Sequence, residues 1–156
     1  MKRILGLDVG DKRIGVAISD ELGITSRGLF TLDRGNIKAD TQKIIDIIIE
    51  NDCSVVVIGL PLNLSGDDSA QTEKARAFAV KLSNKLVSNA MGDVRVELFD
   101  ERFTTVMAER SLEDCGVSRA KLREARRSGL VDQQAAVLML GEWMRGKNFG
   151  EDLGNA

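Results

Sequence analysis

The segment from Val55 to Leu60 constrains the fold of this chain more than any other feature. It is a continuous apolar run in which β-branched side chains predominate. Such a run is typical of a strand that is buried on both faces, as in parallel sheets covered by helices on each side. Pro61, the only proline of the 156-residue chain, ends the run because it has no N–H to donate to a strand ladder. The segment therefore predicts the middle of an α/β sheet.

The segments around this run alternate between strand and helix patterns. The first three predicted strands are separated by tight turns and indicate an antiparallel meander. Later strands alternate with helices, and parallel strands need right-handed crossovers. We therefore expect an α/β fold with a five-stranded mixed sheet, three antiparallel strands followed by βαβαβ, and helices on both faces. The predicted strands are 4–7, 14–19, 24–32, 55–60 and 94–99, and the predicted helices are 37–50, about 75–86, 104–115, 118–127 and 132–143.

Size and composition favour a globular intracellular protein. The hydrophobic content of 43% is ordinary for a folded domain, and we expect residues 1–145 to form one domain. Residues 146–156 are Gly-rich and acidic, which predicts a flexible tail. Apolar stretches are short and interrupted by charges, so we expect no membrane association and a cytoplasmic location. We expect the protein to be a monomer or a homodimer. The net charge of −2 means that any binding to a phosphate backbone must be local.

Histidine and tyrosine are both absent, and this narrows the possible chemistry. Without histidine there is no Ser-His-Asp triad, no Cys-His pair and no HExxH zinc site. The two cysteines, Cys53 and Cys115, are too far apart for a CxxC motif. Catalysis would have to use carboxylates, Lys, Arg, hydroxyls, backbone groups or a hard metal ion held by oxygen ligands.

Acidic residues stand at three points that the predicted topology brings to one edge of the sheet. Asp8 ends the first strand, and a carboxylate directly after a buried run needs a partner, which favours a functional role. Asp100 and Glu101 end the fifth strand, although Glu101 could simply pair with Arg102. Asp132 opens the last helix and could equally be its N-cap. Ligands gather at the carboxyl ends of parallel strands, so these acids are candidate site residues.

Three other segments near this edge are candidates for contacts with an anion. The turn from Gly10 to Arg13, where we expect Gly10 to take a positive φ, could bind a phosphate through N–H groups and Lys12, or be an ordinary hairpin. The loop from Gly59 to Gly66 could contact a substrate, or only end a strand and cap a helix. Residues 119–127 contain five basic side chains and one acidic one, and could bind a phosphate backbone or form a solvated helix face.

Four motifs occur in order along nearly the whole chain. Together they resemble the YqgF family, described both as pre-16S rRNA nucleases and as Holliday-junction resolvase-like proteins. The resemblance implies an RNase H-like fold and a metal-dependent phosphodiesterase site. The motifs are Leu7-Asp8-Val9-Gly10 with Arg13-Ile14-Gly15-Val16-Ala17, Gly59-Leu60-Pro61-Leu62-Asn63 with Gly66, Asp100-Glu101-Arg102 with Thr104-Thr105, and Val131-Asp132-Gln133-Gln134-Ala135-Ala136.

The resemblance also implies roles for individual residues. Asp8, Glu101 and Asp132 correspond to the catalytic acids that bind Mg²⁺ or Mn²⁺, and Asp100 competes with Glu101 for the second position. RuvC-like resolvases carry that second acid on strand four, whereas the corresponding run here ends in Gly59 without an acid. Two metal ions about 4 Å apart would activate a water and stabilise the leaving oxygen. From the residues themselves, the candidate substrate contacts are Gly10, Lys12, Arg13, Asn63, Arg102, Arg126 and Arg127.

The function that these observations favour is a metal-dependent endonuclease acting on structured nucleic acid. We expect it to mature the 5′ end of the 16S rRNA precursor, with pre-16S rRNA and the pre-ribosome as partners. Two alternatives stay open: a resolvase of branched DNA such as Holliday junctions, and a non-catalytic nucleic-acid-binding factor in ribosome assembly. The hairpin after Asp8 also resembles the phosphate loop of actin-like ATPases, but those proteins need two such lobes and this chain has room for one.

Overall fold

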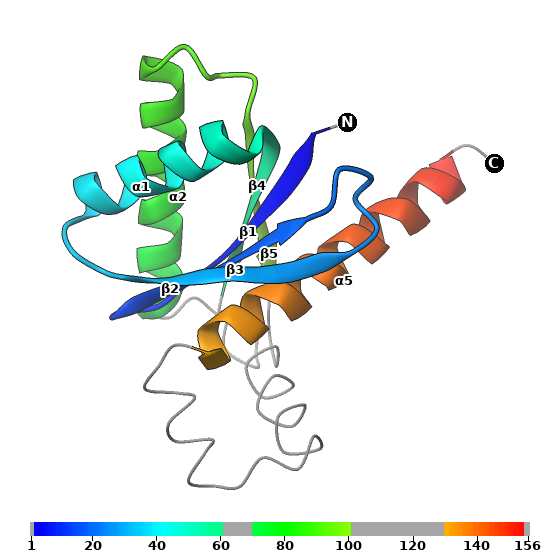
Figure 1. Cartoon of the computed structure of the whole chain (residues 1–156), viewed down its shortest axis with the longest axis horizontal. Helices are drawn as coiled ribbons and strands as arrows, with labels where there is room; N and C mark the ends of the chain where they lie inside the picture. The colour runs from blue at the N-terminus through cyan, green and yellow to red at the C-terminus, as the bar shows by residue number, and fades with distance from the viewer. Residues whose placement is uncertain (1, 61–69, 101–129, 155–156) are drawn as a thin grey trace, which may run out of the picture.

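The computed structural model describes residues 2–60, 70–100 and 130–154, which form one mixed sheet with helices on both faces (Figure 1). The strand order is β3-β2-β1-β4-β5. β1 pairs antiparallel with β2 and β2 with β3, whereas β1–β4 and β4–β5 are parallel, which confirms the predicted sheet. The strands are β1 (Arg3–Val9), β2 (Arg13–Ser19), β3 (Ser26–Asp33), β4 (Cys53–Leu60) and β5 (Arg95–Asp100), and the helices are α1 (Ile37–Asn51), α2 (Ala70–Ser88) and α5 (Leu130–Gly154).

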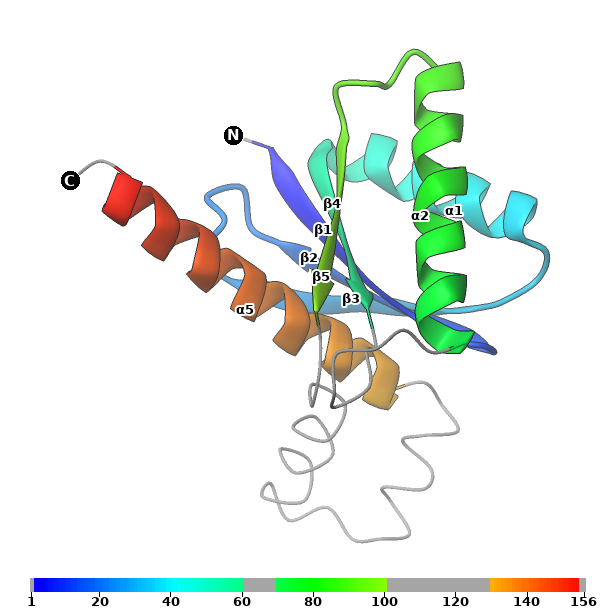
Figure 2. The same ribbon diagram turned by 180° about the vertical axis from the view of Figure 1, so that it is seen from behind.

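Strand β4 lies between β1 and β5 and is covered on both faces, as its apolar run predicts. Val56 and Ile58 belong to the core beneath α1 and α2, while Val57 packs against α5. All three side chains are fully buried. Figures 1 and 2 show α1 and α2 on one side of the sheet and α5 running across the other.

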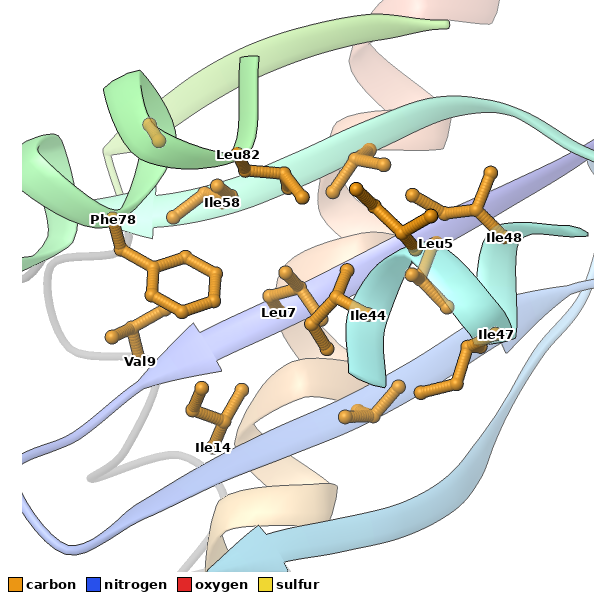
Figure 3. Packing of buried hydrophobic residues seen from close by; sticks show 14 of the residues in the cluster. Leu5, Leu7, Val9, Ile14, Ile44, Ile47, Ile48, Ile58, Phe78 and Leu82 are labelled. Atoms are coloured by element: carbon orange, nitrogen blue, oxygen red, sulfur yellow. The ribbon is translucent and has the colours of Figure 1, made fainter. Parts of the chain in front are cut away.

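The larger core fills the space between the sheet and helices α1 and α2. Odd-numbered residues of β1 and even-numbered residues of β2 point into it, as expected for strands whose side chains alternate between faces. Figure 3 shows these side chains together with those of α1 and α2. The predicted apolar stripe of α2 is confirmed, since its members are all buried: Ala75, Phe78, Ala79, Leu82 and Leu86.

The opposite face carries small residues where α5 crosses it. A Cβ atom on Gly6 of β1 would lie 3.0 Å from the Leu140 Cβ atom. Ala17 of β2 is fully buried in the same cluster as Ala136 and Met139 of α5. The small side chains of the sheet therefore let α5 approach its backbone closely.

Three local predictions differ from the structure. Helix α5 begins at Leu130 and continues to Gly154, so Asp132 lies in its first turn instead of capping it, and the segment expected as a flexible tail is helical as far as Gly154. Gly10 does not take a positive φ; among the described glycines only Gly23 does, at 69°. The helices predicted at 104–115 and 118–127 lie outside the described residues.

In the described part of the chain, no helix is both long and apolar enough to cross a membrane.

Candidate active site

Strand β1 positions Asp8 on the face of the sheet that carries α5. Its neighbours Leu7 and Val9 are buried in the core on the other side, and Gly6 lies against α5. Because successive side chains of a strand alternate between faces, Asp8 shares the face of Gly6. The side chain is half-buried, and its register partner in β2 is Gly15. Asp8 thus stands at the carboxyl end of β1, where the sequence predicts a functional acid.

Helix α5 brings Asp132 to the same place. A Cβ atom on Gly15 would lie 2.0 Å from the Asp132 carbonyl oxygen and 3.0 Å from the Gln133 nitrogen. The first turn of α5 therefore rests on the residue that pairs with Asp8. A helix N-terminus also favours negative charge through its unpaired N–H groups and macrodipole. The structure thus places the main chain at Asp132 against the residue that pairs with Asp8, although most of the sequence separates the two acids.

Arg13 connects this helix to the edge of the meander. Its Nη1 atom lies 4.0 Å from Oδ2 of Asp132, and its Nε atom lies 3.8 Å from Oδ1 of Asp33. Burial raises the pKa of Asp132, and the nearby Arg13 cation opposes this by lowering it. The side chains of Arg13 and Asp132 are only 27% and 31% exposed, so the pair is poorly screened by water. Arg13 thus acts on the ionisation of Asp132.

The turn between β1 and β2 is closed by its own hydrogen bonds. The Gly10 N–H group donates to the Arg13 carbonyl over 2.8 Å, so this amide is already used within the hairpin. The Asp11 carboxylate accepts a hydrogen bond of 2.6 Å from Gln71 Nε2 and also pairs with Lys74, both on α2. These bonds favour the ordinary-hairpin interpretation over an anion-binding turn built on the Gly10 amide. Lys12 is exposed and stays a predicted substrate contact.

A buried ion pair behind this turn is absent from the sequence predictions. Arg34, just after β3, donates from Nη1 to the Gly10 carbonyl over 3.0 Å and from Nε to Asp40 Oδ2 over 3.4 Å. The Asp40 side chain is fully buried. A signal was present in the sequence, because Asp40 falls on the apolar stripe of α1 with Ile44 and Ile47. An acid on such a stripe indicates a buried partner.

The remaining predicted site residues are only partly covered by the structure. Asp100 is the last residue of β5, and its register partner is Leu60 at the end of β4. Within residues 2–60, 70–100 and 130–154, no cluster of three or more His, Cys, Asp or Glu residues is arranged to hold a metal ion. Five predicted residues lie outside the described ranges: Asn63, Glu101, Arg102, Arg126 and Arg127.

Comparison with known proteins relates this geometry to a family. Residues 2–146 match the family model described as RuvX, Holliday junction resolvase. Similar proteins named "Putative pre-16S rRNA nuclease" occur in several bacteria. The Myxococcus xanthus protein is 42% identical over 142 residues, covering 91% of this chain and 87% of its own length. The Koribacter versatilis protein is also 42% identical, over 150 residues that cover 96% of this chain and 91% of its own.

Solved structures confirm the RNase H-like fold. RuvC of T. thermophilus in complex with a Holliday junction substrate superposes with a TM-score of 0.53 at 16% identity, covering 89% of this chain and 92% of that one. The yeast mitochondrial Holliday junction resolvase Ydc2 gives a TM-score of 0.53 at 11% identity, covering 92% and 78%. At these identities the likeness is one of fold.

Proposed function

The chain belongs to the RuvX family and is a nuclease, and on that premise we propose that it cuts the precursor of 16S rRNA at its 5′ end. The names of relatives about 40% identical over most of the chain support this choice of substrate. The observation that carries the catalytic part is the contact between the first turn of α5 and Gly15, the register partner of Asp8. This contact supports a common location for two acids from distant segments.

We further propose that Asp8, Asp132 and Glu101 hold Mg²⁺ or Mn²⁺. Oxygen ligands from carboxylates suit these ions. Burial raises the pKa of Asp132 because it disfavours the charged carboxylate, and a bound cation would stabilise that charge. Glu101 is preferred to Asp100 as the third ligand because, in the Asp100-Glu101-Arg102 motif, it is Glu101 that corresponds to the second acid of the family. When bound, the ions would neutralise charge on the phosphate and lower the pKa of the attacking water.

The protein's own groups would orient the substrate around this centre. Arg13 lowers the pKa of Asp132 against the larger effect of burial, and the N-terminus of α5 favours a phosphate oxygen nearby. Lys12 and the basic segment 119–127, with Arg126 and Arg127, would neutralise backbone phosphates on either side of the scissile bond. Asn63 and Arg102 remain proposed contacts from the segments that follow β4 and β5.

Cleavage of a 5′-extended 16S rRNA precursor beside a four-way DNA junction, each with Mg²⁺ or Mn²⁺, tests this proposal. Asp8→Asn and Asp132→Asn should lower kcat by at least about 100-fold, because each removes a carboxylate that is proposed to hold the ions that neutralise charge on the phosphate. Asp46→Asn, on the exposed face of α1, is the matched control and should retain activity. Glu101→Gln and Asp100→Asn, measured in parallel, identify the remaining acid.

The second candidate, resolution of branched DNA, is favoured by the description of the family model that matches the chain. Faster cleavage of the junction than of the RNA would select it. Binding without cleavage of either would favour the assembly-factor alternative. Asp8→Asn and Asp132→Asn variants as active as the wild type would refute the proposed site itself.

A further inference from the structure

We propose that Arg34 is a positioning residue for the active site, which holds the turn between Asp8 and Arg13 in place from behind. The proposal rests on the proposed catalytic roles of Asp8 and Asp132. It assigns to Arg34 no contact with substrate; its effect passes through the main chain of residues 10–12. Arg34 lies outside the four motifs quoted above.

Arg34 bonds the turn at two points. Its guanidinium Nη1 donates to the Gly10 carbonyl over 3.0 Å, and its own main-chain N–H donates to the Lys12 carbonyl over 2.9 Å. Gly10 follows Asp8 by two residues, and Lys12 directly precedes Arg13, the partner of Asp132. Arg34 therefore holds the main chain at both ends of the turn. It thereby restricts the backbone positions from which the side chains of Asp8 and Arg13 extend.

The guanidinium is itself fixed from the core. Its Nε atom lies 3.4 Å from Oδ2 of Asp40, and the other oxygen of Asp40 accepts a hydrogen bond of 3.0 Å from the Gly35 N–H group. The carbon at the centre of the guanidinium lies 5.7 Å from the ring centroid of Phe78, within the range of a cation–π contact. Asp40 is fully buried and the Arg34 side chain is only 14% exposed. Each of these contacts restricts the position from which Arg34 reaches the turn.

Arg34 does more than stabilise the fold, because its guanidinium group bonds two different partners. Nε donates to Asp40 on one side, and Nη1 donates to the Gly10 carbonyl on the other. Charge neutralisation of Asp40 needs only a cation, which lysine also supplies. Bonding Asp40 and the Gly10 carbonyl at once needs two separated donors in a rigid plane, which lysine lacks. The substitution Arg34→Lys therefore separates the ion pair from control of the turn.

The test measures Arg34→Lys in the full chain by two readouts. In the metal-free protein, amide hydrogen exchange of Gly10 and of residue 34 should accelerate by about 10-fold or more, while core amides of α1 and α2 keep their rates. Under cleavage conditions kcat should fall by about 10- to 100-fold with KM changed less than about two-fold, since small displacements of catalytic groups affect mainly the chemical step. Ile48→Val, in the same core but remote from the turn, should leave kcat and exchange at Gly10 unchanged.

The outcomes separate the possibilities. Uniform acceleration of exchange across the sheet, with kcat lowered only as far as the folded fraction falls, would reduce Arg34 to a stabilising residue and overturn the proposal. Unchanged exchange and kcat would overturn it too. Should Arg34→Lys fail to fold, Asp40→Asn keeps the bond from Gly35 but weakens the hold on Arg34, and the same local changes are expected at smaller size. A wild-type protein that cuts the junction but no rRNA would refute the proposed substrate, while both readouts, with kcat taken on the junction, still decide the role of Arg34.

Discussion

The carbonyl oxygen of Asp132 lies 2.0 Å from the point where a Cβ atom on Gly15 would stand. Heavy atoms that are not bonded do not approach so closely, so a side chain at this position would displace the first turn of α5. Gly15 is also the register partner of Asp8. One glycine therefore sets the separation between the strand that carries one acid and the helix that carries the other.

Gly15→Ala should impair both stability and activity. The methyl group would push backbone against backbone, and we expect a loss of about 1–3 kcal/mol in the free energy of unfolding. Displacement of Asp132 by about 1 Å should lower kcat by about 100-fold. Thermal unfolding and single-turnover cleavage measure the two effects.

Gly28→Ala is the matched control for this prediction. A Cβ atom there would lie 2.9 Å from Gln133 Oε1, the far end of a flexible side chain that can rotate away. It should keep most of the activity. Equal losses in the Gly15 and Gly28 variants would contradict the assignment of Gly15 as the spacer between β2 and α5.

Asp132 should destabilise the metal-free fold at neutral pH. Burial raises its pKa, so the folded chain holds this proton more tightly than the unfolded chain. The resulting stabilisation is complete below the ordinary aspartate pKa and is lost as the pH rises through the higher pKa of the folded state. Asp132→Asn should therefore raise the Tm at pH 7, and this gain should shrink as the pH falls and vanish near pH 3. A lower Tm at pH 7 would contradict this, and Asp46→Asn serves as the exposed control.

Divalent cations should reverse this difference. An ion held by Asp8 and Asp132, as proposed, would bind only the folded chain and would stabilise it by about 2.7 kcal/mol at a concentration 100 times its Kd. A titration with Mg²⁺ or Mn²⁺, followed by thermal unfolding, should raise the Tm of the wild type. The Asp8→Asn and Asp132→Asn variants should respond far less, and an equal response in all three proteins would place the bound ion elsewhere.

Much of this arrangement could be predicted because it depends on local patterns. The apolar run of β4 indicates a strand covered on both faces, and that topology brings the ends of β1 and β5 to one edge. The choice of Asp8 as a candidate site residue follows from the same local pattern, because a carboxylate directly after a buried strand is costly without a partner. The helical stripe of α2 likewise needs only the spacing of its own residues.

Other features depend on contacts between distant segments, which no local pattern contains. The turn at Gly10 suggests positive φ, but the glycine is needed for space, since its Cβ atom would lie 2.9 Å from the Arg13 carbonyl oxygen. The partnership of Arg34 with Asp40 requires knowledge of how α1 packs behind the hairpin. The predicted end of the last helix, at residue 143, was wrong, because the glycines that follow lower helix propensity but do not prevent a helix.

Arg13→Gln should shift the acidic limb of the pH–rate profile to higher pH. Arg13 lowers the pKa of Asp132, so its removal lets burial raise that pKa further. Activity that needs ionised Asp132 would then be lost at a higher pH than in the wild type. The dependence of kcat/KM on pH at one fixed, subsaturating metal concentration measures this, because the proton and the metal ion compete for Asp132. Arg3→Gln, which removes a cation paired with Glu21 at the other end of β1, should leave the limb in place.

Arg126→Gln together with Arg127→Gln should weaken binding in a salt-dependent way. Each lost phosphate contact reduces the slope of log K against log salt by about 0.7 for single strands and 0.9 for duplex. The double variant should therefore bind less tightly at low salt and approach the wild type at high salt. Fluorescence anisotropy over a salt series, with both RNA and four-way junction, measures the slopes.

Lys43→Gln with Lys81→Gln removes the same charge from exposed positions of α1 and α2 and is the matched control. It should leave the slope unchanged, because these helices cover the face opposite α5. A slope that falls equally in both double variants would mean that only the total charge of the protein matters. An unchanged slope after loss of Arg126 and Arg127 would instead make residues 119–127 a solvated helix face, since no phosphate contact would have been lost.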